Sequence, residues 1–434
     1  MTNSTEPSNA HPTSQETRTR LSSSDEQDDV GIEVPSKLVI ELMSAMTAMP
    51  AAAVKLAIRE VERWPTIMPK KRTASAPVPP ERCFVKELAG ETPPSFPAME
   101  RLYRLASDLY GLRPWRVLDE DNLIVVRDSV TGELCYCSVM GALGEVLSMH
   151  AYIGTEGLRQ FRKMEAEEIA DPGEFFASTH CVYVEFVPRA ELQRQDRELL
   201  ATLGHPQGRG LASPIFRTMR PGFLPWFVTE AEARRLAECI RAVIVVCAAV
   251  ASQESVKFWE VADTYPIVTR MEGAESRYQV DLIQSILPAE PPVAPVRLAE
   301  ETLCSLRGLD YAVRGVMELD HIHSGAAIGK KGERSACASI ALAVDARSGA
   351  VLAPEATDSS VAAGEALANV FLKAIQASRT LPREVRVRSQ RLKDCLAPLI
   401  ESFGAAVRVA SQLPASDEAR SHLLGFFRGD IGRR

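Results

Sequence analysis

The spacing of apolar residues divides the chain into one short helical segment and two larger folded units. Residues 36–64 carry apolar positions at helical spacing, interrupted by Pro50, and predict a helical hairpin. Residues 97–287 and 297–434 combine short apolar runs typical of strands with longer stretches of helical period. The pattern predicts a multi-domain protein of mixed α+β and α/β structure.

Three further segments show no pattern of burial. Residues 1–35 are rich in Ser, Thr, Asn, Gln and acids and hold few large apolar residues, which predicts a disordered acidic tail. Residues 65–96 and 288–296 are rich in proline and predict extended linkers. These segments set the expected boundaries of the two larger domains.

The first large domain, residues 97–287, alternates between expected helices and strands. Asp128 and Gly132 suit a type I turn closed by a left-handed glycine, so a hairpin is expected there. Thr155 and Thr229 are the expected N-caps of two helices. The other expected elements are a helix over 97–110, a helix that opens at Pro188, and strands at 115–118, 123–126, 134–140, 146–153, 181–186, 216–220, 226–228, 267–271 and 278–287.

The second large domain has a clearer order. After a helix at 297–306, three strands are followed by alternating helices and strands, in the order βββαβαβα. A turn like that of the first domain, Asp345–Gly349, separates the second and third strands, and one recurring turn type needs no common origin. The expected elements are strands at 313–323, 339–344 and 350–356, a helix at 362–378, a strand at 385–388, a helix at 392–403, a strand at 406–410 and a helix at 416–427.

Charge and cysteine usage narrow the class of protein. The formal net charge is -7, of which residues 1–35 carry -5, so the body is close to neutral and gives no basic signal for nucleic acid. The nine cysteines are scattered without a Cys-x-x-Cys pair, which fits a reducing compartment. The apolar run at 242–251 is too short to span a bilayer, and no secretory signal is present. We therefore expect a cytoplasmic protein with no membrane partner.

Several short motifs resemble two bacterial domain families of unknown function. Those of the first family are Pro114-Trp115, Asp128 to Gly132, Ser138 to Gly141, Leu143 to Glu145, Tyr152 to Leu158, Phe216 to Pro221 and Pro225 to Phe227. Those of the second, a family often found after the first, are Val387 to Ser389, Leu396 to Leu399 and Leu413-Pro414. The resemblance covers residues 97–428; it supports the domain boundaries and implies no activity.

The strand and helix order of the second domain is similar to that of the ribonuclease H-like fold. Its nucleases hold two metal ions between carboxylates to stabilise the attacking and leaving oxygens of a phosphodiester. Candidate carboxylates are Glu318 or Asp320 on the first strand, Glu365 on the first helix, and Asp417 or Glu418 on the last helix. The fourth strand instead ends at Arg388, which would repel a metal. An active nuclease, an inactive relative and an unrelated α/β topology all remain open.

Two motifs of the second domain invite sharper interpretations. His321 and His323 share a strand face at a spacing that metal sites use, and only Cys337 on the neighbouring strand could join them. The stretch Gly325–Gly332 lacks the spacing and the following helix of a phosphate loop. We therefore expect a strand edge and a basic hairpin loop, with no metal site and no cofactor.

Cationic and aromatic residues alternate near the end of the first domain. Arg217, Arg220 and Trp226 could hold phosphates and stack bases, or their segment could fill the core. No complete catalytic set is present, so the sequence favours a non-enzymatic binding or regulatory protein with protein partners. The alternative is a nucleic-acid-binding or phosphodiester-acting protein with a degenerate ribonuclease H-like domain.

Overall fold

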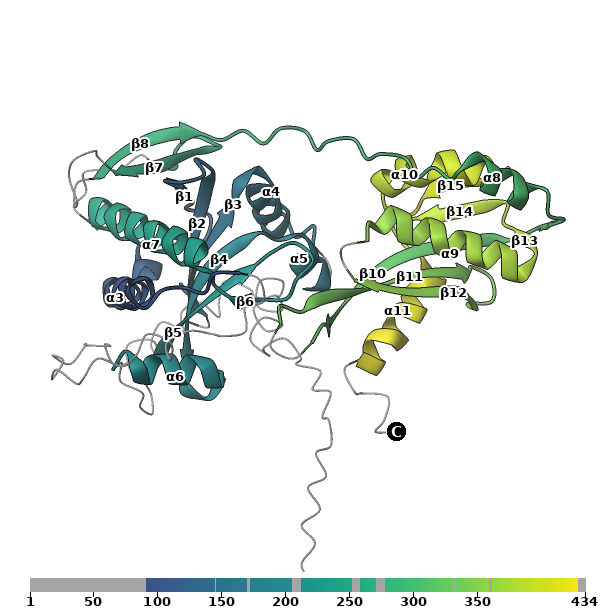
Figure 1. Ribbon diagram of the computed structural model, residues 1–434. Coiled ribbons are helices and arrows are strands. Elements are labelled where there is room, and N and C mark those ends of the chain that lie inside the picture. Colours follow the sequence, from purple (N-terminus) through teal and green to yellow (C-terminus); the bar gives the residue numbers. More distant parts are fainter. Residues whose placement is uncertain are drawn as a thin grey trace, which may run out of the picture. The chain divides into compact units, whose positions relative to one another are not determined.

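The computed structural model describes residues 91–144, 146–169, 172–204, 212–251, 258–270, 278–330, 333–358 and 361–427. The predicted tail, the predicted helical hairpin and the first linker up to residue 90 lie outside these ranges. The chain divides into two compact units, residues 1–32 and 33–434, and every described residue belongs to the second. The described elements confirm a multi-domain chain of mixed helices and strands (Figure 1).

The first domain is built on an eight-stranded sheet with the order β6-β5-β4-β3-β2-β1-β7-β8. Neighbouring strands are antiparallel except β1 and β7, which are parallel. The strands are β1 (Ile124–Arg127), β2 (Leu134–Met140), β3 (Leu147–Ile153), β4 (Cys181–Pro188), β5 (Ala212–Met219), β6 (Trp226–Phe227), β7 (Thr264–Arg270) and β8 (Tyr278–Gln284).

Helices cover both faces of this sheet (Figure 1). The long helices α3 (Phe96–Leu112) and α7 (Glu230–Ala251) pack on the face that carries Cys135, Met149 and Val184. The shorter helices α4 (Gly154–Glu165) and α5 (Pro172–Ser178) pack on the opposite face, against residues such as Tyr136 and Tyr152. Because successive strand residues point to opposite faces, each strand supplies side chains to both layers.

Three local predictions for the first domain are corrected, and one helix is added. Residues 114–116 form a 3-10 turn in place of a strand, because Arg113 adopts a left-handed conformation before Pro114. Helix α4 begins at Gly154, whose positive φ turns the chain directly out of β3, so Thr155 is inside the helix. Helix α6 (Arg194–Thr202) begins after a second 3-10 turn and not at Pro188. Helix α5 was not predicted.

The second domain contains a five-stranded sheet with the order β12-β11-β10-β14-β15. Numbered along this domain, the order is 3-2-1-4-5, with the first three strands antiparallel and the last two parallel to the first. The strands are β10 (Val316–Ile328), β11 (Ala336–Asp345), β12 (Val351–Asp358), β14 (Glu384–Val387) and β15 (Ala406–Val409); β9 (Ala312–Val313) and β13 (Thr380–Leu381) form a separate pair.

The helices of this domain lie on both faces of its sheet (Figure 1). Helices α9 (Ala363–Ser378) and α10 (Gln390–Glu401) pack against the face that carries Met317 and Leu319. Helix α11 (Pro414–Phe427) packs against the other face, where Ile322 and Leu342 contact Ala415. A short helix, α8 (Glu300–Arg307), precedes the sheet.

The two predicted Asp–Gly turns have the same structure. The Asp128 carboxylate accepts the N–H groups of Val130 and Thr131, and the chain leaves the turn through Gly132 at a φ of 72°. The Asp345 carboxylate and Gly349 repeat this arrangement between β11 and β12. Glycine adopts such a φ without steric cost, which makes the hairpin turns readable from sequence.

The far end of the β10–β11 hairpin contacts segments of the first domain. The Cys337 N–H donates to the carbonyl of Gly222, and the Leu224 N–H donates to the carbonyl of Ser335. A Cβ on Gly173 would lie 2.2 Å from the His323 carbonyl oxygen, so only glycine allows α5 to approach β10 this closely. No helix in the described part of the chain is long and apolar enough to cross a membrane.

Candidate functional site

Strand β10 places two of the predicted acids on the sheet face that α11 covers. Glu318 and Asp320 alternate with Met317 and Leu319, and each is only 1% exposed. The Glu318 carboxylate accepts the N–H of Ser416, at the start of α11, over 2.8 Å. Asp320 lies one pleat further along the strand. Burial of this degree requires each carboxylate to have partners or to lose its charge.

Arg388 supplies the partner for Asp320. It follows β14 directly, and its Nε and Nη2 atoms donate to the two Asp320 carboxylate oxygens over 2.7 and 2.6 Å. The same Nη2 atom lies 2.6 Å from Asp417 of α11, so one guanidinium joins the first strand, the fourth strand and the last helix. The hydrogen bonds to Asp320 raise the pKa of Arg388 above its ordinary value, so the cation is permanent.

Glu365 does not join this cluster. It is an exposed residue of α9, and α9 packs on the sheet face opposite to the one that carries Glu318 and Asp320. The structure thus brings together three of the five candidate acids, Glu318, Asp320 and Asp417, and places an arginine among them. Within the described residues no group of three His, Cys, Asp or Glu side chains could hold a metal ion.

The predicted binding surface consists of Arg217, Arg220 and Trp226, and both arginines form ion pairs within the protein. Arg217 is 5% exposed, forms a bidentate ion pair with Asp196 over 3.0 and 2.6 Å, and lies over the Phe227 ring. Arg220 pairs with Glu232 over 2.9 Å and with Glu91. Trp226 is half-buried in strand β6. These contacts correspond to the core alternative; a nucleic-acid role for the three residues stays a prediction.

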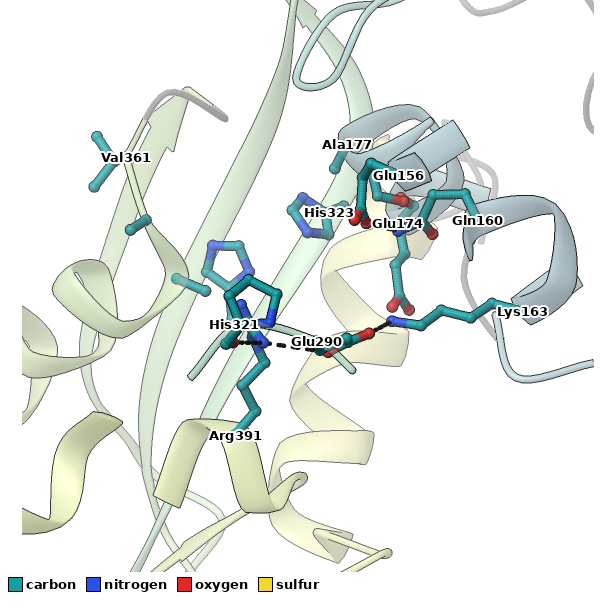
Figure 2. A pocket seen from close by; sticks show the side chains of 14 residues that line it. Glu156, Gln160, Lys163, Glu174, Ala177, Glu290, His321, His323, Val361 and Arg391 are labelled. Carbon is teal, nitrogen blue, oxygen red and sulfur yellow. Dashed lines mark hydrogen bonds and ion pairs between the residues drawn. The ribbon is translucent and has the colours of Figure 1, made fainter. Parts of the chain in front are cut away.

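A cavity of about 420 Å³ lies where α4, α5, the second linker and the start of α9 meet β10. Figure 2 shows its charged groups: Lys163 extends toward Glu290, and Arg391 lies on the other side of that carboxylate. His321 and His323 also line it, with ring centroids 4.7 Å apart. Burial, with a smaller effect of His323, lowers the pKa of His321 to about 4, so this imidazole is neutral at pH 7.

Cys337 does not complete a metal site with the two histidines. Its β-sheet partner is Ala327, beyond an irregularity of β10, and its side chain packs in the apolar cluster of the first domain. His323 Nδ1 instead lies 2.9 Å from the Ser339 hydroxyl. The sequence missed the lining that α4 and the linker contribute to this cavity, because that contact joins residues far apart in the chain.

A cluster of buried polar side chains in the first domain was also not predicted from the sequence. Ser148 and His150 of β3 face the same side as Glu185 of β4, and the pairing register sets Ser148 opposite Glu185. All three are at least 96% buried, yet within the described structure the Ser148 hydroxyl, both His150 ring nitrogens and one Glu185 oxygen have no hydrogen-bond partner. Burial raises the pKa of Glu185 to about 7 and lowers the pKa of His150 to about 3. The visible signal was a His and a Glu inside otherwise apolar strands.

Comparison with known proteins identifies domains but no activity. One domain of unknown function, DUF7309, matches residues 100–267, and a second, DUF6930, matches residues 305–424. No curated protein and no solved structure matches the chain. Both matches fall inside the two large domains that the sequence motifs indicate. The chain therefore carries two consecutive regions that match domains of unknown function, DUF7309 followed by DUF6930.

Proposed function

We propose that the chain is a non-enzymatic binding or regulatory protein of the cytoplasm, whose second domain is a catalytically inactive relative of the ribonuclease H-like fold. The strand order 3-2-1-4-5, with two parallel and two antiparallel neighbours, supports the relationship. The observation that carries the loss of catalysis is the bond of Arg388 to both Asp320 and Asp417.

The argument rests on how the carboxylates are used. A two-metal nuclease needs acids whose oxygens are free to bind divalent ions. Here both oxygens of Asp320 accept N–H groups of Arg388, and one oxygen of Glu318 accepts the Ser416 N–H. A metal ion would have to displace a guanidinium that donates to both oxygens of a buried carboxylate. A single fixed cation in this position supports a binding role.

The test is metal-dependent cleavage by the full chain. Labelled single- and double-stranded DNA and RNA are incubated with the protein and Mn²⁺, and both fluorescence anisotropy and product length are recorded. We expect no cleavage by the wild type or by Asp320→Asn. Cleavage by the wild type that Asp320→Asn abolishes, while the exposed Asp394→Asn control retains it, would overturn the proposal.

The same experiment addresses the alternative of nucleic-acid binding without cleavage, which the strand order also supports. Binding that weakens steeply between about 50 and 200 mM salt would indicate phosphate contacts. That outcome would make nucleic acid the partner and leave the chain non-enzymatic. Absence of binding at micromolar protein would favour protein partners.

A further inference from the structure

Glu290, in the linker between the two domains, is surrounded by cationic side chains. Its carboxylate lies 2.6 Å from Lys163 Nζ and 3.2 Å from Arg391 Nη1. The hydrogen bond from Lys163, together with the charges of Lys163, Arg391 and Arg159, holds the pKa of Glu290 below its ordinary value. The side chain is therefore an anion paired with one cation from α4, Lys163, and one from α10, Arg391, while the charge of Arg159 acts on it without direct contact.

The same cations hold the linker backbone. Arg159 Nη2 donates to the Pro288 carbonyl and Arg391 Nη1 donates to the Pro291 carbonyl, each over 3.0 Å. The Lys163 and Glu290 side chains are about one third exposed and Arg391 is half exposed. Ion pairs at such exposure contribute about 0–1 kcal/mol each, so a free anion can compete with Glu290.

Two groups that line the adjoining cavity have no hydrogen-bond partner of their own among the described residues. Helix α9 begins at the cavity wall with Ala362 as N-cap and has no side-chain cap, so its first N–H groups lack a capping acceptor. The Nε2 atom of His321 is buried without a hydrogen-bond partner among the described residues. A helix N-terminus favours negative charge, and both groups line the space beside Lys163 and Arg391.

The wall also contains acids, which limit what the cavity can accept. Glu156 is held by Arg159 over 3.1 Å and by Gln160 over 2.8 Å, so its charge is compensated locally. Glu174 contributes a further negative charge to the wall. A large polyanion would meet this carboxylate, whereas a small ligand with one oxyanion group can stay near the cations.

We propose that this cavity binds a small ligand through an oxyanion group, phosphate or carboxylate, which displaces Glu290 from Lys163 and Arg391. Glu290 is then an internal competitor, and ligand binding breaks the two ion pairs that join its side chain to α4 and α10. This inference rests on the proposed binding role, for which it supplies the ligand class.

The experiment measures anion affinity of the full chain by isothermal titration calorimetry. Inorganic phosphate and acetate are titrated in separate arms at ionic strength matched with NaCl. Glu290→Gln removes the competing charge and keeps the side-chain shape. We expect it to bind at least one of the two anions about tenfold more tightly than the wild type, because the competent state is no longer occupied by Glu290. The arm that shows the gain identifies phosphate or carboxylate as the recognised group.

Matched variants keep the test specific. Glu301→Gln makes the same charge change on the exposed face of α8, and it is expected to bind both anions as the wild type does. Lys163→Met or Arg391→Met in the Glu290→Gln background is expected to remove the gain. The inference would be overturned if the wild type and Glu290→Gln bound the anions with equal affinity. It would also be overturned if Glu290→Gln, with an unchanged melting curve, bound neither anion. Nuclease activity would overturn the proposed function and leave this titration unaffected.

Discussion

The two domains treat buried acids in opposite ways. In the second domain, Asp320 is 1% exposed and both of its oxygens accept hydrogen bonds from Arg388. In the first domain, Glu185 is 3% exposed and one of its oxygens has no partner in the described structure. A buried carboxyl group can keep its charge by acquiring a cation or can lose its charge through a raised pKa.

The difference indicates which kind of change should alter the stability of each domain. The second domain depends on one guanidinium that joins two strands and a helix, so its acids respond to loss of that partner. The first domain holds Glu185 beside His150, whose pKa burial lowers to about 3, so this pair responds to pH. Three measurements test this contrast between the domains.

The largest effect is expected from Arg388→Met. The change leaves Asp320 buried without its cation, which destabilises a protein by about 3–5 kcal/mol. Urea unfolding near neutral pH measures the loss. The matched control is Arg386→Met, two residues earlier, whose partner Glu384 also pairs with Arg408, and which should cost under about 1 kcal/mol. Equal losses in the two variants would show that Asp320 does not depend on Arg388.

The second-largest effect is expected in how the free energy of unfolding of the first domain changes with pH. The ordinary pKa values are 4.5 for Glu185 and 6.5 for His150, against about 7 and about 3 in the folded state. Between pH 4.5 and 6.5 the folded state holds one proton on Glu185 and the unfolded state holds one on His150. The two states then bind equal numbers of protons, so the pair does not make the free energy of unfolding depend on pH in this range. The contribution of the pair to the free energy of unfolding falls as pH rises above 6.5, because the unfolded state releases its proton from His150. It also falls as pH drops below 4.5, because the unfolded state then binds a second proton, on Glu185.

Single variants separate the two contributions. Relative to the wild type, Glu185→Gln should gain stability as pH rises from 4.5 to 7, by on the order of 3 kcal/mol. His150→Asn should gain relative stability as pH falls from 6.5 toward 3. Urea unfolding at several pH values, with the exposed Glu198→Gln as control, tests both. A difference profile for Glu185→Gln that is flat through this range would show that Glu185 is ionised in the folded protein.

The smallest effect compares two buried serines on one sheet face. Ser138 donates to the Glu120 carbonyl over 2.7 Å, whereas the Ser148 hydroxyl has no partner in the described structure. Ser138→Ala should cost about 1 kcal/mol, and Ser148→Ala should be neutral or stabilising by up to about 1 kcal/mol. Thermal unfolding distinguishes them. A loss at Ser148 as large as that at Ser138 would mean that Ser148 is hydrogen-bonded.

Local signals made much of the fold predictable. The turns at Asp128 and Asp345 depend on residues within five positions of each other, and both form as expected. The strand at 115–118 was wrong because the left-handed conformation of Arg113 outweighs the β-propensity of the residues after it. Helix α5 has seven residues, too few to show a period. The pairing of β1 with β7 joins distant residues and has no local signature.

The candidate sites were predictable only in part. The spacing of Glu318 and Asp320 fixed their shared face, and the arginine at the end of the fourth strand was visible in the sequence. The sequence did not show that α9, which carries Glu365, packs on the opposite face of the sheet. The order of helices and strands along the chain does not say which face of the sheet each helix covers. The cavity around Glu290 was missed for the same reason, since its cations come from helices far apart in the chain.

The position of β7 beside β1 has a consequence for synthesis on the ribosome. Strands β1 to β6 pair in chain order, so each can join the sheet as it leaves the exit tunnel. Val125 and Val126 acquire their second neighbours only when Ile267 and Val268 have been made. We expect the nascent sheet to grow from β1 toward β6 and to keep the outer edge of β1 open until late, when an unpaired strand edge is most exposed to wrong partners.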